Sequence, residues 1–535
     1  MFAPGAPITR SRRRNAYNFP DVTKFFPFRA RGLRRIFAGA ALTSFFTAFV
    51  AIGAIGQTPA DESSAGGLTM DSGPGEGKVV LVLPFDNRTG LPSLEWIREA
   101  AAEVLSTRFA AAGFQPTSRA DRMYALDHLG LPQGFQPSRA SSLKLAQTLD
   151  ADSIVVGSYT TDGSGIAAEA RLVDVPGLRM TPMVSTRGDM HDLIAVFGTL
   201  AWKLTRQLDP SFNVAEETFV AAGRGVPLNA YEQYIRGITE PDQAERVKHL
   251  QEAVGLSPDF GPAWMALGRE DYREQQYPEA AAAFAKVDHN GPDGLEAGFY
   301  RGLSLMFSGD YPHAEQAFAD VARVLSLAEV VNNEAVAKSR QGHDATSLFI
   351  QAAAADPNGA DYHFNLAVSL KRSGNTAGAL NEMAQCLKLR PNDSEAQSLE
   401  DAWKRPTGGA ANADPLERIV RTFDAAAFRQ AAAMMDTVNA GRLAALRPRD
   451  RAQALCVRAK SYLDRGLLLE AERLYQDAEV ADGTSAEAHA GLAEVREQSG
   501  DAEAARREAQ TALELNPANR TAQDVLREIA AKPGR

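Results

Sequence analysis

Apolar and small residues recur at a fixed period along the second half of the chain. Five positions return 34 residues later: Gly268, Tyr277, Pro278, Ala280 and Phe284 recur as Gly302, Tyr311, Pro312, Ala314 and Phe318. A period of this length predicts a helical solenoid, in which each helix pair buries its apolar face by stacking on its neighbours. A stack of this kind presents a long concave surface that can hold another polypeptide, so the pattern indicates a binding protein.

The spacing within one unit points to a particular repeat. Trp264 and Gly268 belong to a first helix, Ala280 and Phe284 to a second, and Pro292 closes the unit. Small residues let the two helix backbones approach, and proline cannot continue a helix. This pattern resembles the tetratricopeptide repeat. The alternative, unrelated alanine-rich helices, does not account for six readable units that share one spacing.

The repeats divide into two blocks. The first is expected over residues 227–403 and is followed by a linker at 404–414. The second is expected over residues 415–531 and opens with a divergent helical pair from Leu416 to Leu446.

The resemblance also implies a partner-binding groove. In tetratricopeptide repeats, certain positions of the first helix face the concave side, and there they hold apolar and aromatic residues that adapt to varied partners. The alternative is that these side chains pack against adjacent helices. The positions that correspond here are Met265, Arg269, Tyr272, Phe299, Leu303, Met306, Asp361, Phe364, Val368 and Lys371.

Residues 78–209 have a different pattern. The apolar run from Lys78 to Phe85 predicts a buried strand, and the segment from Ser93 to Ala112 has helical spacing. A hairpin is expected from Ser153 to Val173, and a closing helix from Asp189 to Leu208. The predicted fold class is therefore multidomain, with an N-terminal α/β domain followed by an all-α tetratricopeptide-repeat superhelix.

Two motifs of this domain resemble a known family. Val82–Asn87 followed by Trp96, and later Leu149–Tyr159, are similar to the TolB-type amino-terminal domain and to the related folds of CsgG and FlgO. The resemblance implies a bacterial envelope protein. This chain departs from it in two ways, since no cysteine follows the apolar N-terminal segment and no propeller follows the domain.

The N-terminus is expected to direct export. Residues 1–35 are basic, residues 36–56 contain no charge, and residues 57–77 have the composition of a linker. An apolar helix of 36–56 would span about 30 Å, roughly one bilayer core. Arginines before it should stay in the cytoplasm, which places the rest of the chain in the periplasm or outside the inner membrane. Both a cleaved signal peptide and a retained membrane anchor remain open.

Charge and cysteine content narrow the choice of partner. The net charge is −10, and the first 35 residues carry nine basic residues and one acidic residue, which leaves −18 on the rest. The folded part therefore lacks the basic surface expected of a nucleic-acid-binding protein. Cys386 and Cys456 lie far apart inside repeats, so we expect neither a disulfide nor a metal site.

No catalytic, cofactor-binding or metal-binding motif is found. The turn Asp86-Asn87-Arg88 follows a strand, where α/β folds often bind ligands, but an Asx-rich turn explains it equally well. The sequence thus favours a non-enzymatic scaffold that binds protein or peptide partners in the cell envelope. The alternative is a regulatory subunit whose α/β domain binds a small ligand or a signalling partner.

Overall fold

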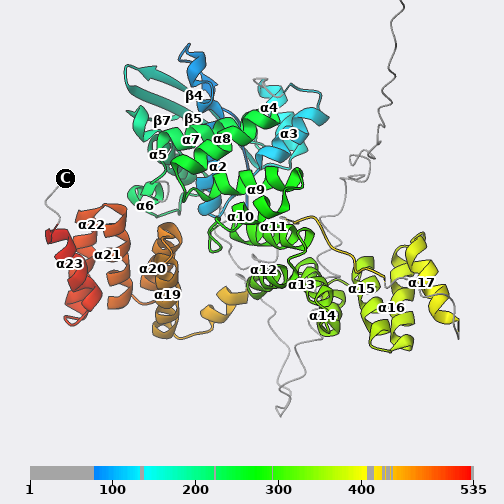
Figure 1. The fold of residues 1–535 in the computed structure, drawn as a ribbon. Coiled ribbons are helices and arrows are strands. Elements are labelled where there is room, and N and C mark those ends of the chain that lie inside the picture. The colour runs from blue at the N-terminus through cyan, green and yellow to red at the C-terminus, as the bar shows by residue number, and fades with distance from the viewer. Residues whose placement is uncertain are drawn as a thin grey trace, which may run out of the picture. The chain divides into compact units, whose positions relative to one another are not determined.

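The computed structural model describes residues 77–132, 138–221, 225–291, 293–405, 415–424, 428, 434 and 438–531. Within these ranges an α/β domain is followed by an all-helical repeat array, as the sequence predicted (Figure 1). The basic N-terminus, the apolar segment 36–56 and nearly all of the predicted linker lie outside the described residues. No helix in the described ranges combines the length and apolar character needed to cross a membrane.

One mixed sheet forms the centre of the α/β domain. The strand order is β3–β1–β4–β5–β6, with β2 also paired to β4 and β7 to β5. β1 pairs in parallel with β3 and β4, whereas β5 is antiparallel to β4, β6 and β7. The strands are β1 (Val79–Val82), β2 (Asp86–Asn87), β3 (Gln115–Pro116), β4 (Ser153–Asp162), β5 (Gly165–Asp174), β6 (Arg179–Met180) and β7 (Val184–Asp189).

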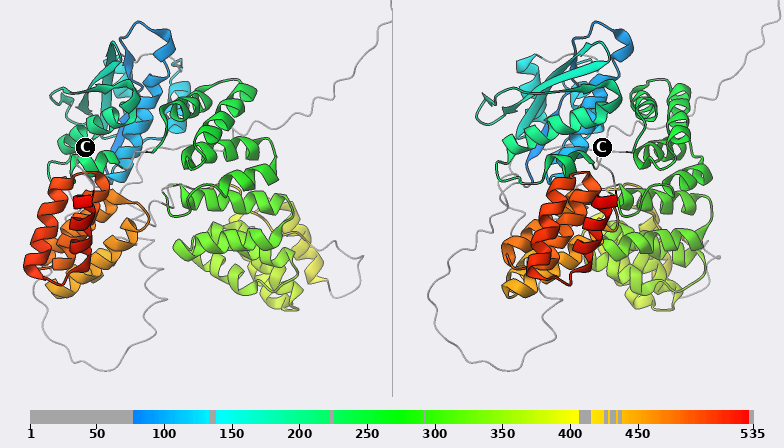
Figure 2. Two further views of the ribbon diagram at one scale, coloured as in Figure 1. Left: turned by 60° about the vertical axis from the view of Figure 1, so that its left-hand side comes forward. Right: turned by 90° about the vertical axis from the view of Figure 1, so that its left-hand side faces the viewer.

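Helices cover the sheet through two separate cores. Val80 and Val82 of β1 belong to the core shared with α2 and α5, and Leu81 and Leu83 belong to the core shared with α3 and α4 (Figure 2). This division follows from the strand itself, because successive side chains point to opposite faces. The covering helices are α2 (Ile97–Ala111), α3 (Arg119–His128), α4 (Arg139–Thr148) and α5 (Leu193–Leu208).

The predicted hairpin is confirmed, with β4 and β5 paired from Ser153 opposite Asp174 to Asp162 opposite Gly165. The closing helix begins at Leu193, later than predicted, because residues up to Asp189 form β7. The sequence pattern missed β7 because its residues are mostly polar.

The array consists of stacked helix pairs. Its 34-residue repeat has a direct steric cause, because a Cβ at Gly268 would lie 2.8 Å from the Phe284 ring, and one at Gly302 would lie 2.7 Å from the Phe318 ring. The first block comprises α7 (Leu228–Thr239), α8 (Gln243–Leu256), α9 (Gly261–Arg273), α10 (Tyr277–Phe284), α11 (Gly294–Phe307), α12 (Tyr311–Val324), α13 (Ala328–Arg340), α14 (Thr346–Ala355), α15 (Ala360–Arg372), α16 (Thr376–Leu389) and α17 (Ser394–Lys404).

The second block differs from the prediction at its start. Residues 415–424, expected to begin a divergent helical pair, form neither helix nor strand. Their backbone groups bond to side chains of the first block instead of to a helix of their own. The regular helices of this block are α19 (Pro448–Leu463), α20 (Leu468–Ala481), α21 (Ala486–Ser499), α22 (Ala502–Leu515) and α23 (Arg520–Ala531).

A short helix after the α/β domain contacts this second block. The Ala215 N–H, just before α6 (Glu216–Ala221), donates to Glu472 Oε1 of α20 at 2.9 Å. The Ser499 hydroxyl of α21 donates to Thr218 of α6 at 3.0 Å. Both cysteines are free and buried.

Candidate functional site

Residues 415–424, here called the bound segment, lie against helices of the first block (Figure 1). Asn365 accepts a hydrogen bond from Arg418 N at 2.6 Å and donates to Arg418 O at 2.8 Å. Asn333 accepts from Val420 N at 2.9 Å and donates to Val420 O at 2.8 Å. The contacted residues are two apart, which is the repeat of an extended chain.

These asparagines occupy equivalent positions in successive repeats. Asn333 is the sixth residue of α13 and Asn365 the sixth residue of α15. Asn332 joins them by donating to Arg418 O at 3.0 Å and accepting from Asn365 at 2.8 Å. All three are buried, and a buried amide destabilises the fold unless it is hydrogen-bonded. The backbone of the bound segment supplies most of those hydrogen bonds.

The Glu417 side chain of the bound segment is buried between two arginines. Arg340 Nε lies 3.2 Å from Glu417 Oε2, and the Arg340 guanidinium also donates to the Glu417 carbonyl at 3.1 Å. Arg372 and Ser339 both contact Oε1. Removing one partner of such a buried pair typically costs about 3–5 kcal/mol, so this position requires an acidic residue.

The next residue, Arg418, meets a cluster of carboxylates. Its guanidinium lies 2.6 Å from Asp393, 3.0 Å from Asp361 and 2.8 Å from Glu395. It also lies 3.6 Å from the centre of the Phe364 ring. Burial alone would lower the pKa of Arg418, but its hydrogen bonds to Asp393, Glu395 and Asp361 outweigh burial and raise that pKa. The hydrogen bond from Arg418 in turn lowers the pKa of Asp393.

The far end of the bound segment is aromatic. The Phe423 ring lies 5.7 Å from that of Phe299 and 4.0 Å from that of Phe428. Phe299 is the sixth residue of α11, the position that Asn333 and Asn365 hold in the next two repeats. The Arg421 guanidinium lies 5.0 Å from the centre of the Phe307 ring. The bound segment therefore runs from α15 back to α11, opposite to the order of the repeats.

We call the set of side chains that hold the backbone, Glu417 and Arg418 of the bound segment the central face. Its members are Asn332, Asn333, Ser339, Arg340, Asp361, Asn365, Arg372, Asp393 and Glu395.

Some of the residues predicted to line a groove do meet the bound segment. Asp361, Phe364 and Phe299 contact Arg418 or Phe423. Arg269 is exposed and pairs with Glu296 at 2.6 Å. Two others are half-buried: Tyr272 packs 5.5 Å from Tyr300, and Lys371 lies 5.9 Å from the centre of the Trp403 ring.

The remaining predicted groove residues need correction. Met265, Leu303, Met306 and Val368 are buried in apolar clusters between helices, as the alternative interpretation of the pattern expected. Their side chains are fully used in packing, so they offer no surface to a partner in this structure. Partner binding by the more exposed positions stays a prediction.

Sequence reasoning missed the asparagines and the bound segment. Asn332 and Asn333 were noted only as the start of a repeat. Two adjacent asparagines on an otherwise apolar helix were the available signal, since asparagine is a poor helix former and needs other partners.

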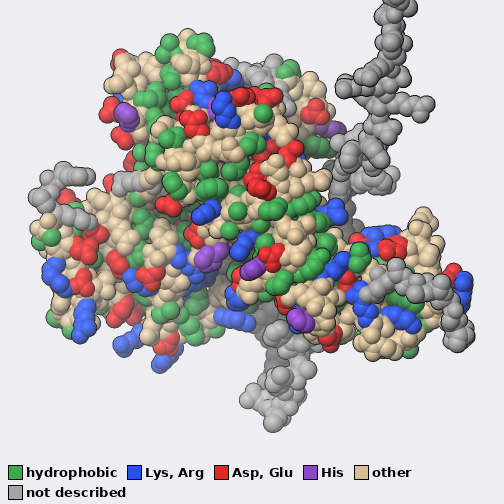
Figure 3. All heavy atoms as spheres, in the orientation of Figure 1, with side chains coloured by type: hydrophobic (Ala, Val, Ile, Leu, Met, Phe, Trp, Pro, Cys, Tyr) green, Lys and Arg blue, Asp and Glu red, His purple; other side chains and the backbone are tan. Residues whose placement is uncertain are grey.

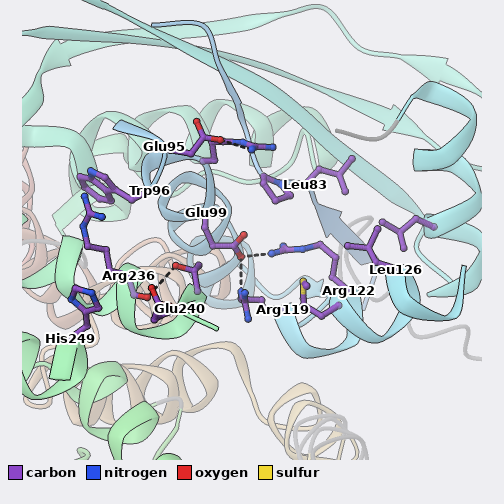
Figure 4. A pocket seen from close by; sticks show the side chains of 15 residues that line it. Leu83, Glu95, Trp96, Glu99, Arg119, Arg122, Leu126, Arg236, Glu240 and His249 are labelled. Carbon is purple, nitrogen blue, oxygen red and sulfur yellow. Dashed lines mark hydrogen bonds and ion pairs between the residues drawn. The ribbon is translucent and has the colours of Figure 1, made fainter. Parts of the chain in front are cut away.

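A second candidate site is a cavity of about 360 Å³ beside β1 (Figure 4). It adjoins the carboxyl end of the strand, and Glu99 lies between Arg119 and Arg122 at its wall. Arg236, Glu240 and His249, from α7, its C-terminal end and α8, line the opposite side. Its arginines are already paired with carboxylates: Arg98 with Glu95, Arg119 and Arg122 with Glu99, and Arg236 with Glu232.

The turn at Asp86-Asn87-Arg88 is held by its own side chains. Asn87 Oδ1 accepts from Thr89 N at 3.0 Å, and Arg88 pairs with Asp86 and with Glu169. On the face drawn in Figure 3, basic and acidic side chains are interspersed.

Comparison with known proteins identifies the helical array. Models of the tetratricopeptide repeat match residues 248–326 and 456–520, and another match covers residues 360–393. The chain contains tetratricopeptide repeats. These matches include α9 to α12, α15, α16, α21 and α22, and most of α20. No curated protein matches the chain.

Several solved structures are similar to part of the chain. YrrB, described as a tetratricopeptide-repeat protein with an unusual peptide-binding site, is 16% identical over 33% of this chain and 92% of its own, with a TM-score of 0.30. MamA from Desulfovibrio magneticus RS-1 is 18% identical over 32% and 100%, with a TM-score of 0.29. The LpoB C-terminal domain from Salmonella enterica is 22% identical over 22% and 85%, with a TM-score of 0.20.

Proposed function

We propose that this protein is a non-enzymatic scaffold of the bacterial cell envelope whose tetratricopeptide repeats hold an extended segment of a protein partner. One observation carries the proposal. Equivalent asparagines of two successive repeats each make two hydrogen bonds to the backbone of an extended chain. Bonds to backbone groups hold a polypeptide in this conformation whatever its side chains are, and the flanking charged residues add selectivity.

The envelope location rests on the N-terminal sequence. An arginine-rich stretch precedes the uncharged residues 36–56, and the TolB-type resemblance of the α/β domain suggests the same compartment. If residues 36–56 are retained, they also anchor the protein in the inner membrane, with the repeats on the far side.

Site-specific photo-cross-linking tests the proposal. A photoreactive amino acid at Arg269, the exposed residue of the predicted groove, should form an adduct with a distinct partner polypeptide in the envelope fraction. The same amino acid at Val480, which is 86% exposed on α20, is the matched control. Adducts of equal yield from both positions, or none from Arg269, would contradict partner binding by the first block.

A second candidate function, ligand binding by the α/β domain, is favoured by the cavity at the end of β1. Open α/β sheets commonly bind ligands beyond the carboxyl ends of their strands. A ligand screen by thermal shift on the full chain tests it. A hit that loses its shift in Arg236→Ala but not in Arg179→Ala, an exposed arginine of β6, would support this function.

A further inference from the structure

We propose that the bound segment is a built-in ligand, which keeps the central face covered until a partner segment of the same chemistry displaces it. This inference rests on the proposed function. It adds to that function the sequence class of the partner and a competition within the chain.

The central face is built to hold a chain that is not part of the repeats. Asn333 and Asn365 each direct both amide groups at backbone atoms of residues 53–87 positions away in sequence. The bound segment adds neither helix nor strand to the array, and α13 to α17 form their helix pairs with one another. Its relation to the repeats is therefore that of a ligand to a receptor.

The side-chain contacts define what else could bind there. Arg340 and Arg372 require an acidic residue at the position of Glu417. Asp361, Asp393 and Glu395 require a basic residue at the next position. These two sets of opposite charge lie side by side, so the order acidic then basic is fixed, and the reverse order would place like charges together.

Apolar contacts complete the pattern. Val420 and Phe423 pack on the core of the central repeats, and Phe423 lies against Phe299. A competing partner segment should therefore be extended, with an acidic and a basic residue in succession, an aliphatic residue two positions later and an aromatic residue three positions after that.

The covalent connection explains why the bound segment prevails in the free protein. Only nine residues separate α17 and Arg405 from Pro415, so the segment is present at an effective concentration on the order of millimolar. A partner displaces it only by being more abundant, or by binding the central face more tightly.

A labelled peptide of residues 415–424 tests the inference in trans. The full chain is compared with two full-length variants: Glu417→Arg with Arg418→Glu, which exchanges the two charges, and Phe423→Ala, which leaves them in place. Fluorescence anisotropy should show at least tenfold tighter peptide binding to either variant than to the wild type. A control peptide of identical composition with Glu417 and Arg418 exchanged should bind none of the chains.

Each other outcome contradicts the inference in its own way. Equal binding to wild type and variants would show that the segment does not cover the face, while peptide binding by the repeats would stand. Absence of binding to variants that fold, as judged by circular dichroism, would contradict peptide recognition as well. Failure of both variants to fold would show that the segment is part of the fold and cannot be displaced.

Discussion

At the scale of single residues, the described part of the chain buries polar groups where they meet partners distant in sequence. Asn365, Glu417 and Glu472 are all buried, and each has its hydrogen bonds supplied by another part of the chain. Because an unsatisfied buried polar group costs more than a satisfied one contributes, these residues fix which segments can pack together.

Asp271 is a buried carboxylate of α9 that works against stability. Burial, together with nearby Glu279 and Glu270, raises its pKa to about 6. The folded state therefore binds this proton more tightly than the unfolded state, and stability falls as pH rises from about 4 to about 6. Asp271→Asn should raise the free energy of unfolding at pH 7 by up to about 3 kcal/mol, with the gain vanishing towards pH 4.

Denaturant unfolding at pH 4, 5, 6 and 7 checks this expectation. The exposed Asp259→Asn is the control and should show no such pH dependence. A gain from Asp271→Asn that is the same at all four pH values would contradict a raised pKa.

At the scale of elements, packing of small against aromatic residues defines the repeats. Ala280 of α10 is completely buried beside Phe284 and Met265, whereas Ala282 of the same helix is exposed. Ala280→Asp would bury an unpaired carboxylate between helices and should destabilise the array by roughly 3 kcal/mol or more. Ala282→Asp should leave the circular dichroism melt nearly unchanged. Equal melting of the two variants would show that the repeat register is wrong.

The repeats could be predicted from sequence because their contacts are local. Gly268 meets Phe284 only 16 residues away, and the same pair recurs as Gly302 and Phe318, so periodicity alone indicates the packing. The bound segment could not be predicted in this way. Arg418 reaches Asn365 and Val420 reaches Asn333 across 53 and 87 residues, and no spacing within one helix encodes such a contact.

The predicted groove was displaced for a related reason. The resemblance placed Phe364 and Val368 on the inner surface, whereas α15 directs Asp361, Asn365 and Arg372 at the bound segment. A shift of one position on a helix turns a side chain by about 100°, so apolar residues next to the true face were taken for it.

At the scale of the molecule, Glu472 connects the α/β region to the second repeat block. It is completely buried, pairs with Arg496 at 2.7 Å and accepts from Ala215 N at 2.9 Å. Glu472→Ala would leave the Arg496 charge buried without its partner, at a cost of about 3–5 kcal/mol. Amide exchange of residues 215–221 should then accelerate, whereas Glu479→Ala on the same helix should have no such effect. Unchanged exchange in Glu472→Ala would contradict this connection.

Export of the whole molecule depends on residues before the α/β domain. Alkaline phosphatase fused after Gly77 should be active in the envelope of a Gram-negative host, because residues 36–56 would carry it across the inner membrane. A fusion after Arg35, which lacks the apolar run, should be inactive. Activity of the Gly77 fusion only in a host that permits cytoplasmic folding of the enzyme would contradict export.

The central claim is that the repeats hold an extended chain by its backbone. Hydrogen–deuterium exchange of residues 415–424 in the full chain measures this directly, because the Arg418 and Val420 amides donate to Asn365 and Asn333. We predict slow exchange of these two amides in the wild type, and exchange at least tenfold faster in the variant Asn333→Ala with Asn365→Ala. Exchange of Arg418 and Val420 at the rate of an unstructured peptide in the wild type would contradict the claim.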